Sequence, residues 1–403
     1  MATVAVTYTT SSIINAASIA PNNVASGGAA VSKPLVRYAA QSQRPLLGRC
    51  GDYMAAALRV QSVGQTLPVF IPRIQVGQSN PTKTIYNVSV SWVYTGGLGP
   101  SSAVYQDTEY VTFVPDITYA PVADAPLQKQ DITSEYYYIY SYSSFCTMIN
   151  AALSVAFIQV KNLAIANGIS AGWTFPLRSP VIERVPGGFS IGLYNTYYAP
   201  NGTLAQAYGQ WFVTFNDALF ALFNGFPAGS VLPTAGSLPP DVYHTLLLPA
   251  TALAPEDGAA PDVLNTEFDC TDAWSPVMLV QVASATLPAV FESTFNPVFV
   301  GAQTAFEAGT GGLTGAAVSG ATANIVVSFG FGLAAGAADL TQKLTYTPSG
   351  ERKWVELVGD QPLTDLTWSL LWVDSINGET HPMTFQTGGW AELELVYQHT
   401  AAA

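Results

Sequence analysis

Short segments with the alternating pattern of β-strands recur through this chain, and turns rich in glycine and proline separate them. The run Thr84–Tyr94 is the clearest example, because its alternation places Tyr86, Val88 and Trp92 on one face. Segments with helical periodicity are too few to supply the crossovers of a parallel sheet. The sequence therefore predicts a mainly β protein of the jelly-roll type, with one or two antiparallel β-sandwiches and a few inserted helices.

One long helix is predicted near residues 143–167, directly after a tyrosine-rich strand at Glu135–Tyr142. Ser143 or Ser144 is expected to cap its first turn, and Gly168 is expected to end it. Apolar residues occupy more than one side of this segment, so we expect the helix to be covered on several sides.

The distribution of turns and prolines predicts four consecutive units. A short helix capped by Asn216 is expected within the second unit, and Asn377-Gly378 predicts a hairpin turn in the last. The units are an N-terminal arm at 1–50, a β-sandwich with the helical insertion at 51–226, a Pro/Gly-rich linker with loops at 227–262, and a C-terminal β-sandwich portion at 263–403.

Charge is scarce and unevenly placed along the chain. Only 10% of the residues are charged, whereas about 25% is usual in a soluble domain. Residues 1–200 carry a net charge of +3 and residues 201–403 carry −16. Such a surface protects poorly against self-association, which suits a protein that copies of itself cover. The acidic balance excludes wholesale coating of nucleic acid, so any such contact should be weak and confined to residues 33–73.

The sequence predicts no disulfide framework, resident cofactor or membrane span. Cys50, Cys146 and Cys270 lack disulfide and zinc spacing, so buried reduced thiols are expected. The N-terminus has no basic signal-peptide region, which predicts synthesis in the cytoplasm. The uncharged run Ala308–Ala338 is too rich in Gly, Ser and Thr for a strong membrane-spanning helix.

The patterns that resemble catalytic motifs favour structural explanations. Gly188-Phe-Ser-Ile-Gly192 matches G-x-S-x-G, but strand-like sequence follows Ser190 where a nucleophile elbow needs a helix. The histidines do not cluster in the sequence, and they lie at His244, His381 and His399. Glu392 and Glu394 alternate with leucines, which is typical of the exposed face of a strand. The sequence therefore predicts that the protein is not an enzyme.

Acidic residues surround Cys270 and form a candidate calcium site. Glu267, Asp269 and Asp272 offer the hard oxygen ligands that Ca²⁺ prefers, although their spacing does not match an EF-hand. Solvated carboxylates are the simpler explanation of this cluster.

The tyrosine-rich segment is a candidate interface between subunits. At strand spacing Tyr136, Tyr138, Tyr140 and Tyr142 share one face. Tyrosine favours buried and inter-subunit surfaces because it is amphipathic, but exposed rings could also stack on sugars.

Two C-terminal segments resemble the closing strands of viral jelly-roll capsid and structural proteins. They are Leu357–Met383 and Gly388–Tyr397, and the tyrosine-rich passage into a helix at Glu135–Phe157 is similar in kind. The resemblance implies a virion structural protein that self-assembles into an icosahedral shell or its vertices. Its partners would be copies of itself and other virion proteins. Residues 1–48 lack the strongly basic arm of simple RNA-virus capsids, so an acidic shell, vertex or minor capsid protein fits better.

Two other functions remain open from the sequence alone. A carbohydrate-binding adhesin or lectin-like β-sandwich would use exposed aromatic residues, and a hydrolase would use Ser190. For the virion protein, we expect residues 33–73 to face the particle interior and the acidic second half to face outward or toward other subunits.

Overall fold

The structure is a computed structural model, and it describes most of the predicted strands and the long helix. The described residues are 8–15, 37–41, 49–75, 82–96, 103–116, 135–169, 178–193, 207–231, 242–247, 262–271, 274–284, 287–289, 294–295, 323–330, 343–348, 352–363, 365–376, 378 and 380–399.

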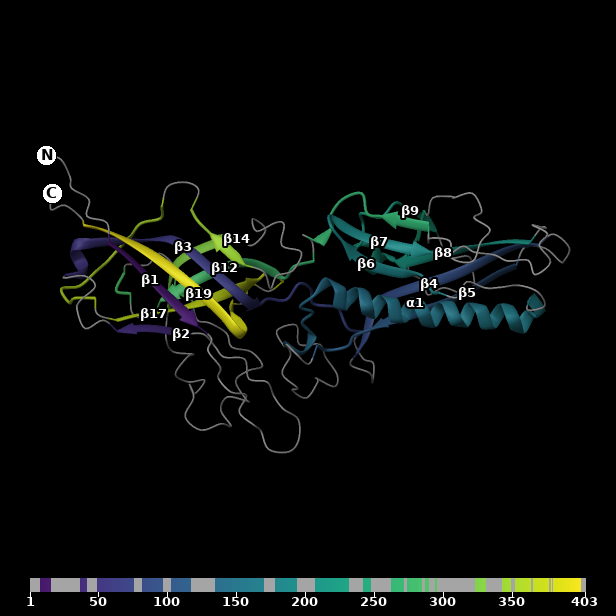
Figure 1. The fold of residues 1–403 in the computed structure, drawn as a ribbon, viewed down its shortest axis with the longest axis horizontal. Coiled ribbons are helices and arrows are strands. Elements are labelled where there is room, and N and C mark those ends of the chain that lie inside the picture. The colour runs from purple at the N-terminus through teal and green to yellow at the C-terminus, as the bar shows by residue number, and fades with distance from the viewer. Residues whose placement is uncertain are drawn as a thin grey trace, which may run out of the picture.

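Two antiparallel sheets form one end of the molecule, which we call lobe 1 (Figure 1). The first sheet has the order β1-β19-β3-β15, and β16 also pairs with β3. The second has the order β13-β14-β12-β17-β18, and β2 also pairs with β17. The strands are β1 (Tyr8–Asn15), β2 (Arg37–Gln41), β3 (Tyr53–Thr66), β12 (Val277–Ser284), β13 (Thr294–Phe295), β14 (Ala323–Gly330), β15 (Leu344–Tyr346), β16 (Val355–Glu356), β17 (Asp365–Asp374), β18 (Thr380–Pro382) and β19 (Thr384–His399).

Alternate side chains of β19 point into the core of lobe 1 and away from it. Leu393 and Leu395 are buried, whereas the intervening Glu392 and Glu394 contact Arg59 on β3. The predicted exposed face of this strand is thus a half-buried face with its own ion pairs. Opposite these strands, Phe329 of β14 stacks on the ring of Tyr346 in β15 at 4.2 Å between centroids, which joins the two sheets.

The other half of the molecule is an insertion between β3 and β12, residues 67–276, which we call lobe 2. It holds a five-stranded sheet, β5-β4-β8-β10-β9, and a three-stranded sheet, β11-β7-β6. The strands are β4 (Lys83–Gly96), β5 (Ala103–Thr112), β6 (Val181–Val185), β7 (Gly188–Leu193), β8 (Ala207–Asn216), β9 (Ala228–Val231), β10 (Tyr243–Leu246) and β11 (Asp262–Asn265). The helix α1 (Tyr142–Ala164) packs against β4, β5 and β6.

Short helical segments complete the fold. Cys50–Asp52 (η1) and Glu135–Tyr137 (η2) are 3₁₀-helical, and Ile165–Ile169 (η3) extends α1 as a π-helical turn. The helix α2 (Asp217–Phe220) begins as predicted, because the Asn216 side chain accepts a hydrogen bond from the backbone N–H of Leu219.

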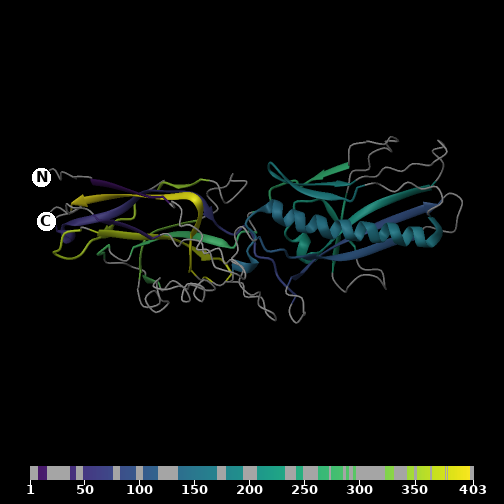
Figure 2. The ribbon, with the colours of Figure 1, turned by 60° about the horizontal axis from the view of Figure 1, so that its bottom comes forward.

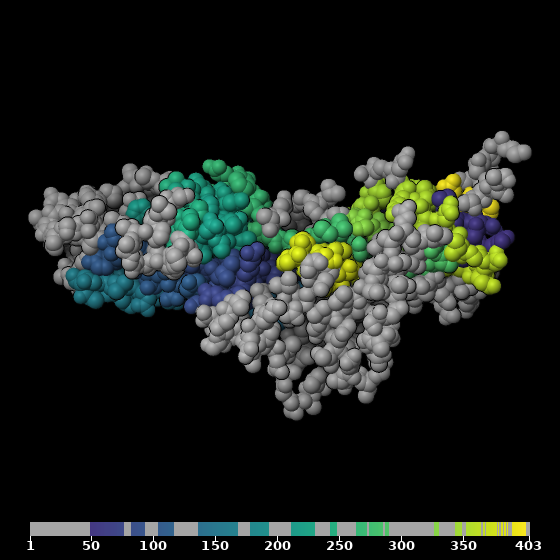
Figure 3. Space-filling model, turned by 180° about the vertical axis from the view of Figure 1, so that it is seen from behind, coloured from purple at the N-terminus to yellow at the C-terminus, as the bar shows by residue number. Residues whose placement is uncertain are grey.

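The two lobes follow each other along the long axis (Figures 1, 2 and 3), and α1 runs nearly parallel to that axis (Figures 1 and 2). Every strand pair in the described part of the chain is antiparallel, and the mainly β class is confirmed. The pairing joins segments that the sequence analysis assigns to different units. For example, β3 pairs with β19, and β1 from the predicted arm adds to the same sheet.

An aromatic cluster fastens the two connections between the lobes. The chain enters lobe 2 past Phe70 and leaves it past Trp274, whose ring centroids lie 5.6 Å apart. Trp274 stacks on Phe189 at 5.0 Å and meets the edge of Phe223 at 4.9 Å. Its indole N–H donates to the carbonyl of Leu222 at 2.6 Å, so the buried indole is both packed and hydrogen-bonded.

The predicted strand at Glu135–Tyr142 is wrong. Glu135–Tyr137 forms a 3₁₀ turn, and the extended part is a single bridge between Ile139 and Phe70. Helix α1 then begins after Ser141, earlier than either predicted cap, and Gly168 lies inside the π-helical turn. Local tyrosine content favours a strand, but within this segment the backbone of Ile139 pairs only with Phe70, as a single bridge.

The predicted hairpin turn between β17 and β18 is present. Gly378 has φ +71°, a left-handed conformation that glycine adopts without steric cost, and its N–H donates to the carbonyl of Asp374. The run Ala308–Ala338, which is predicted not to span a membrane, lies mostly outside the described residues. Its described part, β14, is a strand, as expected.

Candidate assembly surface

Helix α1 buries one face in lobe 2 and leaves an apolar stripe uncovered. Val155, Ile158, Leu163 and Ile165 are 44%, 51%, 42% and 45% exposed. The only charged residue in the whole helix is Lys161. The helix is therefore covered on fewer sides than predicted, and its open side carries four exposed apolar side chains together with the uncharged Gln159 and Asn162, which is typical of a surface that a partner covers.

The same helix satisfies the length and composition of a membrane span. Tyr142–Asn167 is the one helix in the described part of the chain that does so, but half of its apolar window is buried inside lobe 2. A core helix passes the same test, so the predicted absence of a membrane span stays a prediction.

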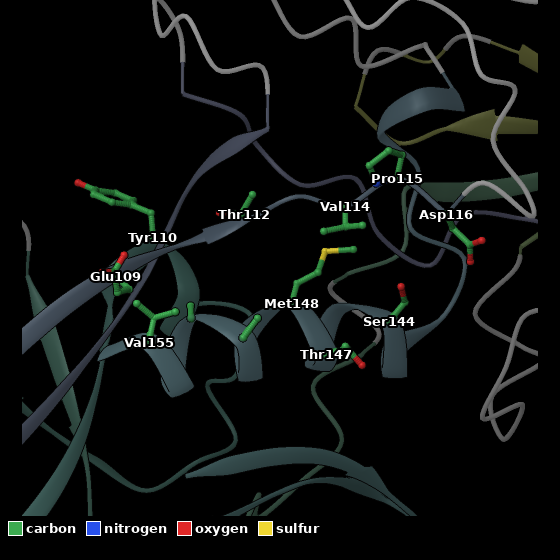
Figure 4. Close-up of a pocket in the computed structure, with 12 residues that line it drawn as sticks. Glu109, Tyr110, Thr112, Val114, Pro115, Asp116, Ser144, Thr147, Met148 and Val155 are labelled. Atoms are coloured by element: carbon green, nitrogen blue, oxygen red, sulfur yellow. The ribbon is translucent and has the colours of Figure 1, made fainter. Parts of the chain in front are cut away.

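A groove of about 390 Å³ runs between α1 and β5, the edge strand of the five-stranded sheet. Figure 4 shows Met148 and Val155 rising from α1 toward Glu109 and Val114 on the strand and its extension. An edge strand offers unpaired backbone groups, and an apolar groove beside it offers area, so the two together suit a protein partner.

Two partly buried carboxylates of β5 have raised pKa values, and one of them, Glu109, lines the groove. Burial and the nearby charge of Asp107 raise the pKa of Glu109, and the attraction of Lys83 opposes this rise. Burial likewise raises the pKa of Asp107, one of whose carboxylate oxygens is buried without a hydrogen-bond partner.

The outer face of the three-stranded sheet is a second uncovered surface. Val181 of β6 and Val263 of β11 both lie opposite Gly192 of β7, and the two valines are 39% and 45% exposed. One register step along, Ser190 lies opposite Glu183 and donates a hydrogen bond to its carboxylate at 3.4 Å. This face of the sheet therefore carries two exposed valines beside Gly192 and a polar row at Ser190 and Glu183.

The G-x-S-x-G segment does not form a nucleophile elbow. Gly188, Ser190 and Gly192 lie in the strand β7, and Ser190 is buried within it. A nucleophile elbow instead needs a sharp turn between a strand and a helix. The glycine at 188 has a structural reason, because a Cβ there would lie 2.0 Å from the hydroxyl oxygen of Thr266.

The histidines have separate structural contacts. His244 stacks on Phe220 and pairs with Asp217 at 3.0 Å. His381 is buried against Trp372, and His399 meets the ring of Tyr53. The absence of an enzymatic activity stays a prediction for this fold.

The four tyrosines do not share an accessible face. Tyr138, Tyr140 and Tyr142 are buried within the chain, and only Tyr136 is partly exposed. Tyr138 meets the edge of Trp372 in lobe 1, and Tyr142 meets Trp274. In this arrangement Tyr138 contacts lobe 1, and three of the four tyrosines offer no surface for a neighbouring subunit or a sugar.

The acidic cluster around Cys270 is engaged by a cation from a distant strand. Arg184 of β6 donates two hydrogen bonds to the Asp269 carboxylate, at 2.8 and 3.3 Å. Burial alone would raise the pKa of Asp269, but the hydrogen bonds from Arg184 and Thr271 lower it below its ordinary value. Glu267 is exposed, and Asp272 lies outside the described residues. Among the residues described, no group of three metal-ligating side chains occurs, and calcium binding stays a prediction.

The described cations of the basic segment 33–73 mostly pair within the chain. Arg49 binds Asp360, and Arg59 binds Glu392 and Glu394. Arg73 is exposed beside a second hollow of about 790 Å³ between the lobes. Lys33 and Arg44 lie outside the described residues, so the weak nucleic-acid contact stays a prediction.

Comparisons with known proteins agree with this architecture. The sequence model of the Sputnik minor capsid protein V18/19 family matches residues 18–399. The chain is 31% identical over 131 residues to the uncharacterized protein V18 of Sputnik virophage, an alignment that covers 31% of this chain and 72% of that protein.

Two solved structures share the fold along nearly the whole chain. A chain in the 3.5 Å cryo-EM structure of the Sputnik virophage has a TM-score of 0.60 at 21% identity, covering 98% of both chains. The crystal structure of the mavirus penton protein has a TM-score of 0.51 at 13% identity, covering 98% of this chain and 99% of that one.

Proposed function

This chain belongs to the Sputnik minor capsid protein V18/19 family, and from that premise we propose that five copies form a capsomer at the vertices of an icosahedral virion. A virion structural role and a jelly-roll-type sandwich follow from the family and the fold. The vertex position is the finer step, and the likeness to a mavirus penton protein supports it.

The uncovered, almost charge-free face of α1 carries this proposal. A monomer rarely leaves such a surface open to water, whereas an assembling subunit covers it with a neighbour. The groove beside β5, which α1 also lines, adds area to the same side of lobe 2. In the capsomer, the two-sheet sandwich of lobe 1 would lie in the shell, and lobe 2 would project from it. Other virion proteins would contact lobe 1 from the surrounding shell.

The size of the purified full-length protein tests the proposal. Light scattering with negative-stain imaging should show discrete particles of five copies, in equilibrium with monomer at low concentration. Repeating the measurement with calcium and with a chelator tests whether Ca²⁺ contributes. A protein that stays monomeric at every concentration would contradict the proposed capsomer.

The burial of the tyrosines argues against the carbohydrate-binding alternative. The tyrosine stripe that would have formed the sugar platform is largely buried. Synthesis in the host cytoplasm stays part of the proposal rather than a property of the fold.

A further inference from the structure

The hollow between the lobes carries a cation without a partner. Its volume of about 790 Å³ lies within the range of about 300–1,000 Å³ that is typical of ligand pockets. Val242 from lobe 2 and Ile376 from lobe 1 line the hollow, and they are 45% and 56% exposed. Two charged residues, Arg73 and Asp217, share the lining. His244 binds Asp217 at 3.0 Å, whereas Arg73 is exposed and forms none of the ion pairs of the described residues.

A hydroxyl donor lies beside this cation in the hollow. Tyr86 lines the hollow and is 4% exposed, and its hydroxyl oxygen accepts a hydrogen bond from the backbone N–H of Arg73 at 3.4 Å. Burial raises the pKa of Tyr86 to about 12, against the opposing effect of Arg73, so the hydroxyl keeps its proton at neutral pH. Within the described part of the chain, that proton has no acceptor. A guanidinium and a hydroxyl donor beside apolar side chains suit a carboxylate that an apolar group accompanies.

The bend after β11 presents a carboxylate and an aromatic ring side by side. Glu267 is exposed and Phe268 is 52% exposed, and no described residue pairs with the carboxylate or stacks on the ring. The chain is fixed at the bend, because the N–H of Glu267 donates to the carbonyl of Gly225 at 2.8 Å and Asp269 binds Arg184. A fixed bend loses little conformational freedom on binding. Neither Glu267 nor Phe268 lines the hollow of its own chain.

We propose that the Glu267–Phe268 bend of one copy inserts into the hollow between the lobes of the next copy, a contact that rests on the proposed five-copy capsomer. The Glu267 carboxylate would bind the guanidinium of Arg73 and accept a hydrogen bond from the hydroxyl of Tyr86. The Phe268 ring would pack on the exposed apolar side chains that line the hollow. The partner is thus a second copy of this chain.

Opposite charges on two different surfaces of the chain favour a second copy as the occupant. The bend carries an unpaired carboxylate and the hollow an unpaired guanidinium, so the two surfaces are electrostatically complementary. An odd-numbered ring closes only when one patch of each subunit meets a different patch of the next, because a self-complementary contact closes at two copies. A contact between bend and hollow is of this kind. An aromatic ring in a pocket beside an arginine is also typical of the few residues that carry most of the binding energy of an interface.

Charge reversal tests the contact directly. In full-length protein, Arg73→Glu and Glu267→Arg should each weaken the capsomer at least about tenfold, measured as the protein concentration at which half of it is pentameric by mass photometry or light scattering. The double variant Arg73→Glu/Glu267→Arg should restore most of the wild-type value, because it rebuilds the pair in the opposite sense. Arg352→Glu is the matched control, since Arg352 is an exposed arginine that does not line the hollow, and it should leave the pentamer intact.

Removal of the aromatic ring tests the apolar part of the contact. Phe268→Ser should also weaken the pentamer at least about tenfold, because the ring would no longer fill the hollow. Leu247→Ser should leave the pentamer intact, because Leu247 is a comparably exposed apolar residue, at 56%, outside both the bend and the hollow. Circular dichroism and thermal melting identify any variant that has lost its fold.

The outcomes distinguish the two proposals. A wild-type protein that never forms pentamers contradicts the capsomer itself. A wild-type pentamer that tolerates Phe268→Ser and the single charge reversals overturns only the contact between bend and hollow. Single reversals that weaken the pentamer without rescue by the double variant also overturn this contact, since the two residues would then not face each other. Equal weakening by Arg352→Glu overturns it as well, because net charge alone would then explain the effect.

Discussion

The pair formed by Arg184 and Asp269 joins strand β6 to the segment after β11. The guanidinium lies over the rings of Tyr142 and Phe189, at 5.3 and 5.0 Å, and also donates to the carbonyl of Gly188 at 2.7 Å. A planar, delocalised cation is suited to bind a carboxylate and stack on aromatic rings at once. The sequence cluster that suggested a calcium site is thus explained, at Asp269, by a cation that lies 85 positions away in the sequence.

Asp269→Asn should make the stability of the protein less dependent on pH. The folded-state pKa of Asp269 lies below its ordinary value of 3.8, so its charge stabilises the fold above that pH, and this contribution is lost as the pH falls through the folded-state pKa. At pH 7 the variant should lose about 1 kcal/mol, a low figure because Asp269 is partly exposed. Urea denaturation from pH 7 to pH 3 should show the difference shrinking.

The matched control is Asp360→Asn. Asp360 pairs with Arg49, but both side chains are largely exposed, so this substitution should cost little at any pH. Equal losses in the two variants, or a loss at Asp269 that persists at low pH, would contradict the assigned role of the Arg184 pair.

At the scale of elements, regular periodicity predicted the strands well and the long helix to within a few residues. The cap at Asn216 and the glycine of the β17–β18 turn were predictable because their chemistry is local. The tyrosine-rich segment was not, because its conformation depends on Phe70, which is 69 positions from Ile139. The exposed stripe on α1 was equally difficult to predict. Helical periodicity shows which faces of a helix are apolar, but it does not show which of these faces the rest of the chain covers.

The sequence predicted least well which strands pair with each other in each sheet. Strands 53–66 and 384–399 pair along nearly their full length, with a bulge where Gly64, at φ +74°, faces Gly389. A Cβ at Gly64 would lie 3.0 Å from the Cα of Gly389, so the close approach needs glycine. Nothing in either strand alone indicates its partner across more than 300 residues, so consecutive units were the natural prediction.

Trp274→Ala should destabilise the protein by about 3–5 kcal/mol, because it leaves a cavity in the aromatic cluster and an unpaired carbonyl at Leu222. Trp274→Phe keeps most of the packing and loses only the indole N–H, so its loss should be clearly smaller. Chemical denaturation followed by circular dichroism measures both. Similar losses in the two variants would show that the hydrogen bond, rather than the packing, holds this connection.

In the folded molecule, cations from the first half of the chain lie beside carboxylates from the second half. The acidic second half and the more basic first half share a sheet of lobe 1, where Arg59 of β3 contacts Glu392 and Glu394 of β19. In lobe 2, Arg184 from the first half likewise binds Asp269 from the second. The charge asymmetry along the chain therefore does not produce one basic and one acidic lobe. The expected orientation of residues 33–73 toward the particle interior remains a prediction that only an assembled particle can test.

A single hydrophobic cluster spans both lobes, which predicts one cooperative unfolding transition. The cluster includes Trp372 and Leu393 in lobe 1 as well as Phe145 and Trp211 in lobe 2. Because an insertion with its own core could unfold alone, the contacts at the junction decide whether it does so. Calorimetry of the wild-type protein at low concentration, where it is monomeric, should show a single transition.

Tyr138→Ala should split that transition into two. Tyr138 packs edge-on against Trp372 at 5.9 Å, and next to it Ile139 exchanges backbone hydrogen bonds with Phe70. Removing the ring opens the junction without touching the interior of either lobe, so the less stable lobe should then melt first. Val358→Ala, an exposed position in lobe 1, provides the control and should keep one transition. Two transitions already present in the wild-type protein would show that the junction does not couple the lobes, and the capsomer could then flex at lobe 2 while lobe 1 stays fixed in the shell.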